Sequence, residues 1–141
     1  MTICRPNQPQ DNCYMLAEKT SRNEALISRM RWLFIESSSK MTLYAAKLVE
    51  SQLTGPQMFF SKEFSRMLPE VKTTLIMDYE GSDNPVTGTL IKTFRGISRI
   101  TKGWKKFREE HNLKHGVVYI FNFFRPLDRL DKRWGLSVHR A

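Results

Sequence analysis

The sequence contains little cysteine, which limits the covalent and metal chemistry available to it. Its two cysteines, Cys4 and Cys13, are separated by eight residues in a polar N-terminal stretch. No histidine is nearby, and this spacing matches no zinc-binding motif. A small-loop disulfide is one interpretation. Free thiols in a reducing compartment are the other, and we favour it.

Long hydrophobic runs are also missing. No segment approaches the ~20 apolar residues that a membrane-spanning helix needs. The first residues lack the apolar core of a signal peptide. We therefore expect an intracellular protein with no membrane partner.

The residue patterns of catalytic sites are absent as well. The sequence has no Gly-rich phosphate loop, no nucleophile elbow and no Cys/His pairing. His111 and His115 flank the end of a predicted helix, where cations interact favourably with free carbonyls, so metal binding by this pair is the less favoured interpretation. Asp128 and Asp131 lie among basic residues in a predicted charged loop. We expect no enzymatic activity, no cofactor, no metal and no small-molecule substrate.

Acidic residues are scarce in the last third of the chain. Residues 1–90 contain ten Lys/Arg and ten Asp/Glu, whereas residues 91–141 contain thirteen and four, which accounts for the whole formal net charge of +9. A charge distribution of this kind most often serves a polyanionic partner such as nucleic acid. The alternative is that the basic residues only keep a small protein soluble.

The composition is sufficient for one folded domain with an appendage. At 141 residues and 40% hydrophobic composition, the chain can fill one core. We expect residues 1–13 to be irregular. A possible capping box from Ser21 to Glu24 and the helical spacing of Leu26, Met30 and Leu33 predict a helix over residues 22–36. Residues 1–40 are therefore interpreted as an N-terminal extension, with residues 37–40 as a linker.

From residue 41 onward, β-branched and aromatic residues alternate with turn signals. These patterns predict two short helices, near residues 61–68 and 102–111, and seven strands, at residues 42–49, 57–60, 71–79, 86–94, 96–101, 117–124 and 135–140. The absence of a βαβ rhythm favours a mainly β fold, a small barrel or sandwich.

Aromatic side chains are concentrated in the strand predicted at residues 117–124. Tyr119, Phe121, Phe123 and Phe124 are expected in the core, because the whole strand is apolar. The alternative is a stacking platform for single-stranded bases, which requires these rings at the surface.

Several motifs in residues 42–140 resemble those of one family. Residues 100–107 (ITKGWKKF) are similar to its Gly-Trp-x-x-Phe run, and residues 112–116 (NLKHG) to the run from Asn and Leu to a turn glycine. Residues 58–64 (MFFSKEF) are similar to its second-strand segment and residues 119–121 (YIF) to a later strand. The family is the plant-specific B3 DNA-binding domain. Val117 replaces its usual Asp and Ser61 its usual Pro, and this divergence resembles the reproductive-meristem-like branch.

The resemblance implies a seven-stranded open pseudobarrel with short helices over residues 41–141. It also implies two arms that grip the DNA major groove, an N-arm near residues 50–57 and a C-arm near residues 92–99. The candidate DNA-binding residues are Lys47, Ser51, Gln52, Lys92, Arg95, Ser98, Arg99, Lys102 and Lys105.

The resemblance therefore predicts a plant nuclear protein that binds double-stranded DNA and regulates transcription. The alternative is a degenerate B3 copy that acts as a protein-interaction module, with self-association or a protein partner through Leu26, Met30 and Leu33.

Overall fold

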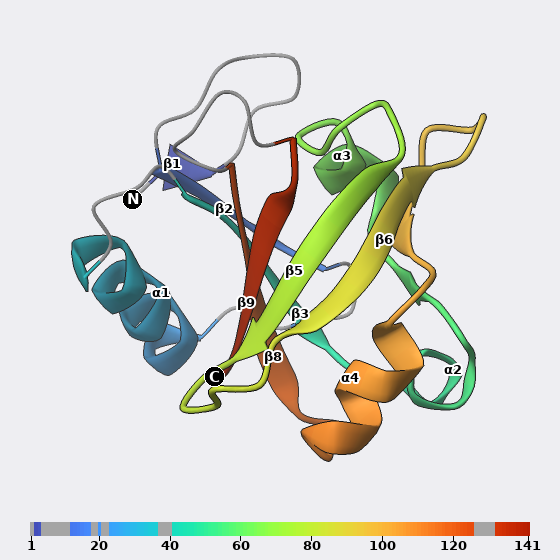
Figure 1. Ribbon diagram of the computed structural model, residues 1–141. Helices are drawn as coiled ribbons and strands as arrows, with labels where there is room; N and C mark the ends of the chain where they lie inside the picture. Colours follow the sequence, from blue (N-terminus) through green and yellow to red (C-terminus); the bar gives the residue numbers. More distant parts are fainter. Residues whose placement is uncertain (1, 4–11, 18–19, 21–22, 37–40, 126–131) are drawn as a thin grey trace.

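The computed structural model describes residues 2–3, 12–17, 20, 23–36, 41–125 and 132–141. Within them, nine strands form one curled, open sheet (Figure 1). The strand order across the sheet is β1-β2-β3-β8-β9-β5-β6-β7-β4. The strands are β1 (Thr2–Ile3), β2 (Asn12–Leu16), β3 (Met41–Lys47), β4 (Met58–Phe59), β5 (Thr73–Tyr79), β6 (Val86–Lys92), β7 (Ser98–Ile100), β8 (Val118–Phe124) and β9 (Trp134–Arg140).

The mainly β fold with an open, barrel-like sheet confirms the predicted fold class. Strands β3 to β9 are the seven expected in residues 41–141, and β1 and β2 raise the number to nine. The prediction that residues 1–13 are irregular was wrong where β1 and β2 form. Strand β2 runs parallel to β3, with Tyr14 beside Leu43. This pairing covers an edge of β3 that would otherwise expose unpaired backbone groups.

Four short or medium helices accompany the sheet in the described residues. They are α1 (Glu24–Glu36), α2 (Glu50–Thr54), α3 (Lys62–Ser65) and α4 (Trp104–Glu110). At the start of α1, the side-chain oxygen of Asn23 accepts a hydrogen bond from the backbone N–H of Leu26 at 2.8 Å. Ser21, the expected cap, lies outside the described residues. None of the helices in the described part of the chain is long and apolar enough to cross a membrane.

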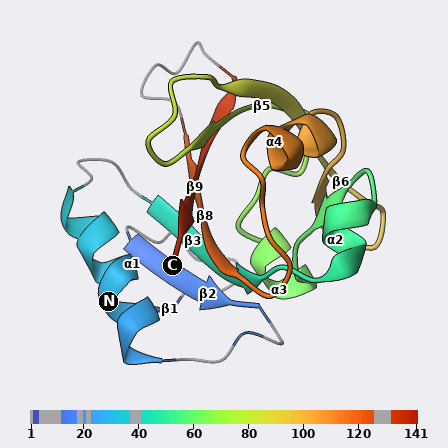
Figure 2. The same ribbon diagram turned by 90° about the horizontal axis from the view of Figure 1, so that it is seen from below.

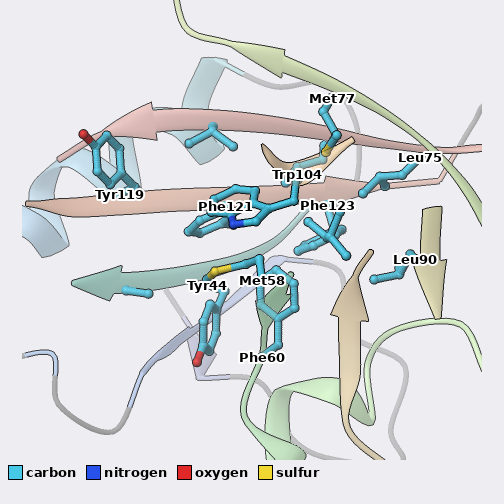
Figure 3. Packing of buried hydrophobic residues seen from close by; sticks show 14 of the residues in the cluster. Tyr44, Met58, Phe60, Leu75, Met77, Leu90, Trp104, Tyr119, Phe121 and Phe123 are labelled. Atoms are coloured by element: carbon cyan, nitrogen blue, oxygen red, sulfur yellow. The ribbon is translucent and has the colours of Figure 1, made fainter. Parts of the chain in front are cut away.

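The inner face of the curled sheet holds the main core (Figure 3). Trp104 and Phe107 of α4 fill it from one end, and both are fully buried. Phe121 and Phe123 of β8 are buried as well, and Phe60 makes edge contacts with both rings, at centroid distances of 5.6 and 5.3 Å. The stacking-platform alternative was therefore wrong for Tyr119, Phe121 and Phe123, while Phe124 is only half-buried.

Helix α1 covers the outer face of β3 and β8 (Figure 2). Its apolar residues form a second cluster with three fully buried side chains of the sheet, Leu43, Ala45 and Ile120. Without α1 and β2, these sheet residues would face water, because successive residues of a strand point to opposite faces. Strands β1 and β2 are thus part of the same sheet, and α1 is its cover.

Candidate nucleic-acid interface

The turn between β6 and β7 forms a compact arm, which we call the C-arm (residues 92–99). The N–H of Thr93 donates to the carbonyl of Ile97 at 2.9 Å, and the N–H of Gly96 donates to the carbonyl of Thr93 at 2.9 Å. The N–H of Ile97 also donates to Oγ1 of Thr93 at 3.2 Å. Gly96 has a φ of 84°, which favours glycine. Phe94 and Arg95 therefore occupy the two corners of a hydrogen-bonded turn, and the predicted strand to residue 94 ends at Lys92.

The segment after β3 forms the N-arm (residues 50–57), and it contains α2 where the sequence suggested a loop. Oε1 of Gln52 accepts a hydrogen bond from the N–H of Val49 at 2.9 Å, which caps this short helix. Two side chains of the α4 segment hold the arm. The indole Nε1 of Trp104 donates to the carbonyl of Gln52 at 2.8 Å, and Nη2 of Arg108 donates to the carbonyl of Gly55 at 3.1 Å. The N-arm is consequently fixed to the core.

The sheet edge formed by β4 and β7 connects the two arms. Phe59 and Arg99 are cross-strand partners on this edge. Nη1 of Arg99 donates to Oε1 of Gln57 at 2.8 Å, and its guanidinium lies 5.9 Å from the centroid of the Phe59 ring. Arg99 is half-buried, so its charge is held in a defined place between the arms.

Both arms lie on the side of the molecule opposite α1. In Figure 1, the β6–β7 turn and α2 lie on the right and α1 on the left, and Figure 2 shows the same separation. The first turn of α4, which follows β7, lies on the same side as the arms. The described N-terminal elements therefore leave the arms uncovered.

The structure places most of the predicted contact residues at the surface of the molecule. Five are exposed and two, Gln52 and Arg99, are half-buried. The exposed residues are Lys47, Ser51, Arg95, Lys102 and Lys105.

Lys92 and Ser98 differ from the other predicted contact residues in being largely or fully buried. The Lys92 side chain is only 6% exposed, and its Nζ donates to the carbonyl of Leu68 at 3.0 Å and to a carboxylate oxygen of Glu70 at 2.7 Å. Ser98 is fully buried, and its N–H donates to Oγ of Ser65 at 2.8 Å. Both residues hold the base of the C-arm and present little or no surface to a ligand.

Tertiary packing adds residues that local patterns did not single out. Lys62 of α3 is exposed and lies beside the C-arm, since a Cβ built on Gly96 would be 3.9 Å from Cε of Lys62. Phe94 is 96% exposed at the corner of the C-arm turn. Lys62 lies within the motif of residues 58–64, which was used only as a sign of the fold. Its distance from Gly96 in the sequence gives no local signal of their contact.

The electrostatic character of the two arms differs. Residues 48–57 contain no lysine or arginine, and Glu50 is exposed there. The C-arm and its neighbour α3 contribute exposed cations instead. Burial raises the pKa of the Tyr79 hydroxyl, with Tyr119 and Glu80 acting in the same direction, so this group stays protonated and adds no negative charge.

The sequence was compared with known proteins. No protein-family model matches it. A stretch of 54 residues is 35% identical to the B3 domain-containing protein REM20 of Arabidopsis thaliana. The predicted resemblance to the plant B3 family is confirmed. The matched stretch covers 36% of this chain and 19% of the relative, so the match spans about a fifth of that B3 protein.

Two solved structures are also similar to this chain. One is a hypothetical Arabidopsis thaliana protein, with a TM-score of 0.49 and 17% identity, covering 70% of this chain and 89% of the other. The second is the Arabidopsis FUS3–DNA complex, with a TM-score of 0.48 and 11% identity, covering 69% and 94%.

Proposed function

We propose that this protein binds double-stranded DNA through a B3-type domain formed by residues 41–141, with residues 1–40 as an extension. The observation that carries the proposal is the position of the two arms. They project from one side, they flank an edge with a positioned guanidinium, and α1 packs on the opposite side. The confirmed B3 resemblance supports the same interpretation.

The C-arm supplies the main contact in this proposal. The major groove of B-DNA is about 12 Å wide and admits a two-stranded β-ribbon. The β6–β7 hairpin is such a ribbon, with Arg95 at its tip and Lys62 beside its turn. These cations contact phosphates, and Arg99 lies behind them on the sheet edge. Lys102 and Lys105 add positive potential near the start of α4.

The N-arm contributes polar groups in place of charge. Ser51 is exposed on α2, and the amide nitrogen of Gln52 stays available while its oxygen caps the helix. Amide and hydroxyl groups can bond base edges. Glu50 on this arm repels phosphate, so affinity depends mainly on the C-arm side.

In this proposal the protein acts in the nucleus as a regulator of transcription, and the support is the B3 resemblance. The alternative, a protein-interaction module that uses the apolar face of α1, has less support. Leu26, Met30 and Leu33 are all buried against the sheet of the same chain.

The test is selection from a random duplex library at two salt concentrations, followed by affinity measurements on the selected duplex. We expect Arg95→Glu to weaken binding about tenfold or more, since one cation of the tip becomes an anion. Arg31→Glu is the matched control, because Arg31 is exposed on α1, away from the arms. The affinity of this variant for the duplex should change much less. A wild-type chain that binds no duplex at low salt would refute the proposal.

A further inference from the structure

We propose that Phe94 reads thymine, by placing its ring against the C5-methyl groups that thymine presents in the major groove. This inference rests on the proposed duplex binding and adds a base preference to the same surface. It concerns a residue that neither the motifs nor the charge pattern singled out.

The first argument is the exposure of this side chain. Phe94 is 96% exposed, more than any other large apolar side chain that the structure describes. Phe59, the other phenylalanine found exposed among the residues with a described side chain, is 47% exposed and is partly covered by Arg99 on the sheet edge. Phe94 thus contributes almost nothing to the core, and its apolar surface is available for a contact with a ligand.

The second argument is that the backbone that carries the ring is held in place. The turn that carries it is closed by three hydrogen bonds between Thr93, Gly96 and Ile97, two of which join backbone groups. The arrangement, with a left-handed glycine after the two corner residues, is typical of a three-residue hairpin loop. Below the turn, Lys92 ties the end of β6 to Leu68 and Glu70. Binding therefore requires little further ordering of the backbone.

The third argument is the chemistry of the neighbouring charge. The guanidinium carbon of Arg95 lies 5.5 Å from the centroid of the Phe94 ring. If Arg95 bonds a phosphate or a base edge, the adjacent ring enters the groove with it. Thymine is the base that presents an apolar group in the major groove, and apolar side chains, Phe among them, contact its methyl.

The experiment compares thymine with deoxyuridine, which lacks only the methyl group. Each thymine of the selected duplex is replaced in turn, and affinities are measured for the wild type, Phe94→Ala and Phe94→Leu. For the wild type, we expect at least one replacement to weaken binding about fourfold, the factor that corresponds to one buried methyl. Phe94→Ala should bind thymine and deoxyuridine duplexes equally, while Phe94→Leu should keep part of the preference.

Trp32→Ala is the matched control, since Trp32 is 47% exposed on α1, on the opposite side. It should keep the full preference of the wild type. Equal sensitivity of wild type and Phe94→Ala to every replacement would overturn the inference, and so would a selected site without thymine. A loss of affinity in Phe94→Ala with no effect of deoxyuridine would also overturn it, and would indicate a ring wedged between bases. These results leave duplex binding intact, whereas a wild type that binds no duplex overturns the proposed function first.

Discussion

Lys92 and Arg95 show how burial separates two cations three residues apart. Both lie at the β6–β7 hairpin and both were predicted to face DNA. Lys92 is the last residue of β6, and its ammonium group donates hydrogen bonds to the Leu68 carbonyl and to Glu70. Arg95 is exposed at the tip of the hairpin. Of these two basic residues, Lys92 therefore stabilises the arm, whereas Arg95 is available to bind a ligand.

At this scale we predict that Lys92→Met lowers the free energy of unfolding by about 1–3 kcal/mol, because it removes charge-assisted hydrogen bonds of a buried side chain. Affinity for the selected duplex should change much less than in Arg95→Glu. Chemical denaturation and a binding titration on the same preparations measure the two quantities. If the Lys92→Met chain keeps its stability but loses affinity as strongly as Arg95→Glu, Lys92 is a contact residue after all.

At the scale of the element, α1 works as the cover of the sheet. Its apolar side chains contact Leu43, Ala45 and Ile120, and Nη2 of Arg29 donates to a carboxylate oxygen of Glu80 in the turn after β5. Helix α1 packs on a sheet to which β2 adds a strand beside β3. Helix α1 and strand β2 therefore contribute to the stability of the sheet that carries the arms.

We predict that Met30→Ala lowers the free energy of unfolding by about 2–5 kcal/mol, because Met30 is fully buried and the change leaves a cavity. Arg31→Ala is the control on the same helix, and as an exposed position it should change stability by about 0.5 kcal/mol or less. Thermal or chemical unfolding measures both. Unchanged stability of Met30→Ala, together with loss of a dimer in sedimentation, would instead favour the interaction-module hypothesis.

At the scale of the whole molecule, the fold places cations of different segments on one side. Lys62, Arg95, Arg99, Lys102 and Lys105 come from α3, the C-arm, β7 and the start of α4. The elements that carry the C-arm and the start of α4 face away from α1. Duplex binding should then be dominated by release of counterions.

If these five cations each neutralise one phosphate, the logarithm of the association constant should fall against the logarithm of salt concentration with a slope of about −4.5, at ~0.9 per contact. Titrations of one duplex at several salt concentrations measure the slope. Lys62→Ala should make it shallower by about one, and a variant on α1, Arg31→Ala, should leave it unchanged. A slope near zero for the wild type would contradict an electrostatic interface.

Local patterns were sufficient for much of this protein. The alternation of apolar residues predicted the strands of residues 41–141, and the apolar run at residues 117–124 predicted the burial of Tyr119, Phe121 and Phe123. The motifs of residues 100–116 pointed to the B3 family. Each of these signals depends on neighbours within a few residues, which is why they can be read along the chain. The excess of basic residues after position 90 is likewise a property of composition.

Tertiary structure decided which of those basic residues are available. Lys92 is occupied by Leu68 and Glu70, Ser98 is buried against Ser65, and Lys62 lies beside Gly96, all through contacts between segments distant in sequence. The pairing of β2 with β3 and the cover formed by α1 are of the same kind. Whether a side chain is buried, paired or free depends on the surfaces that meet it, and those surfaces exist only once the sheet has curled.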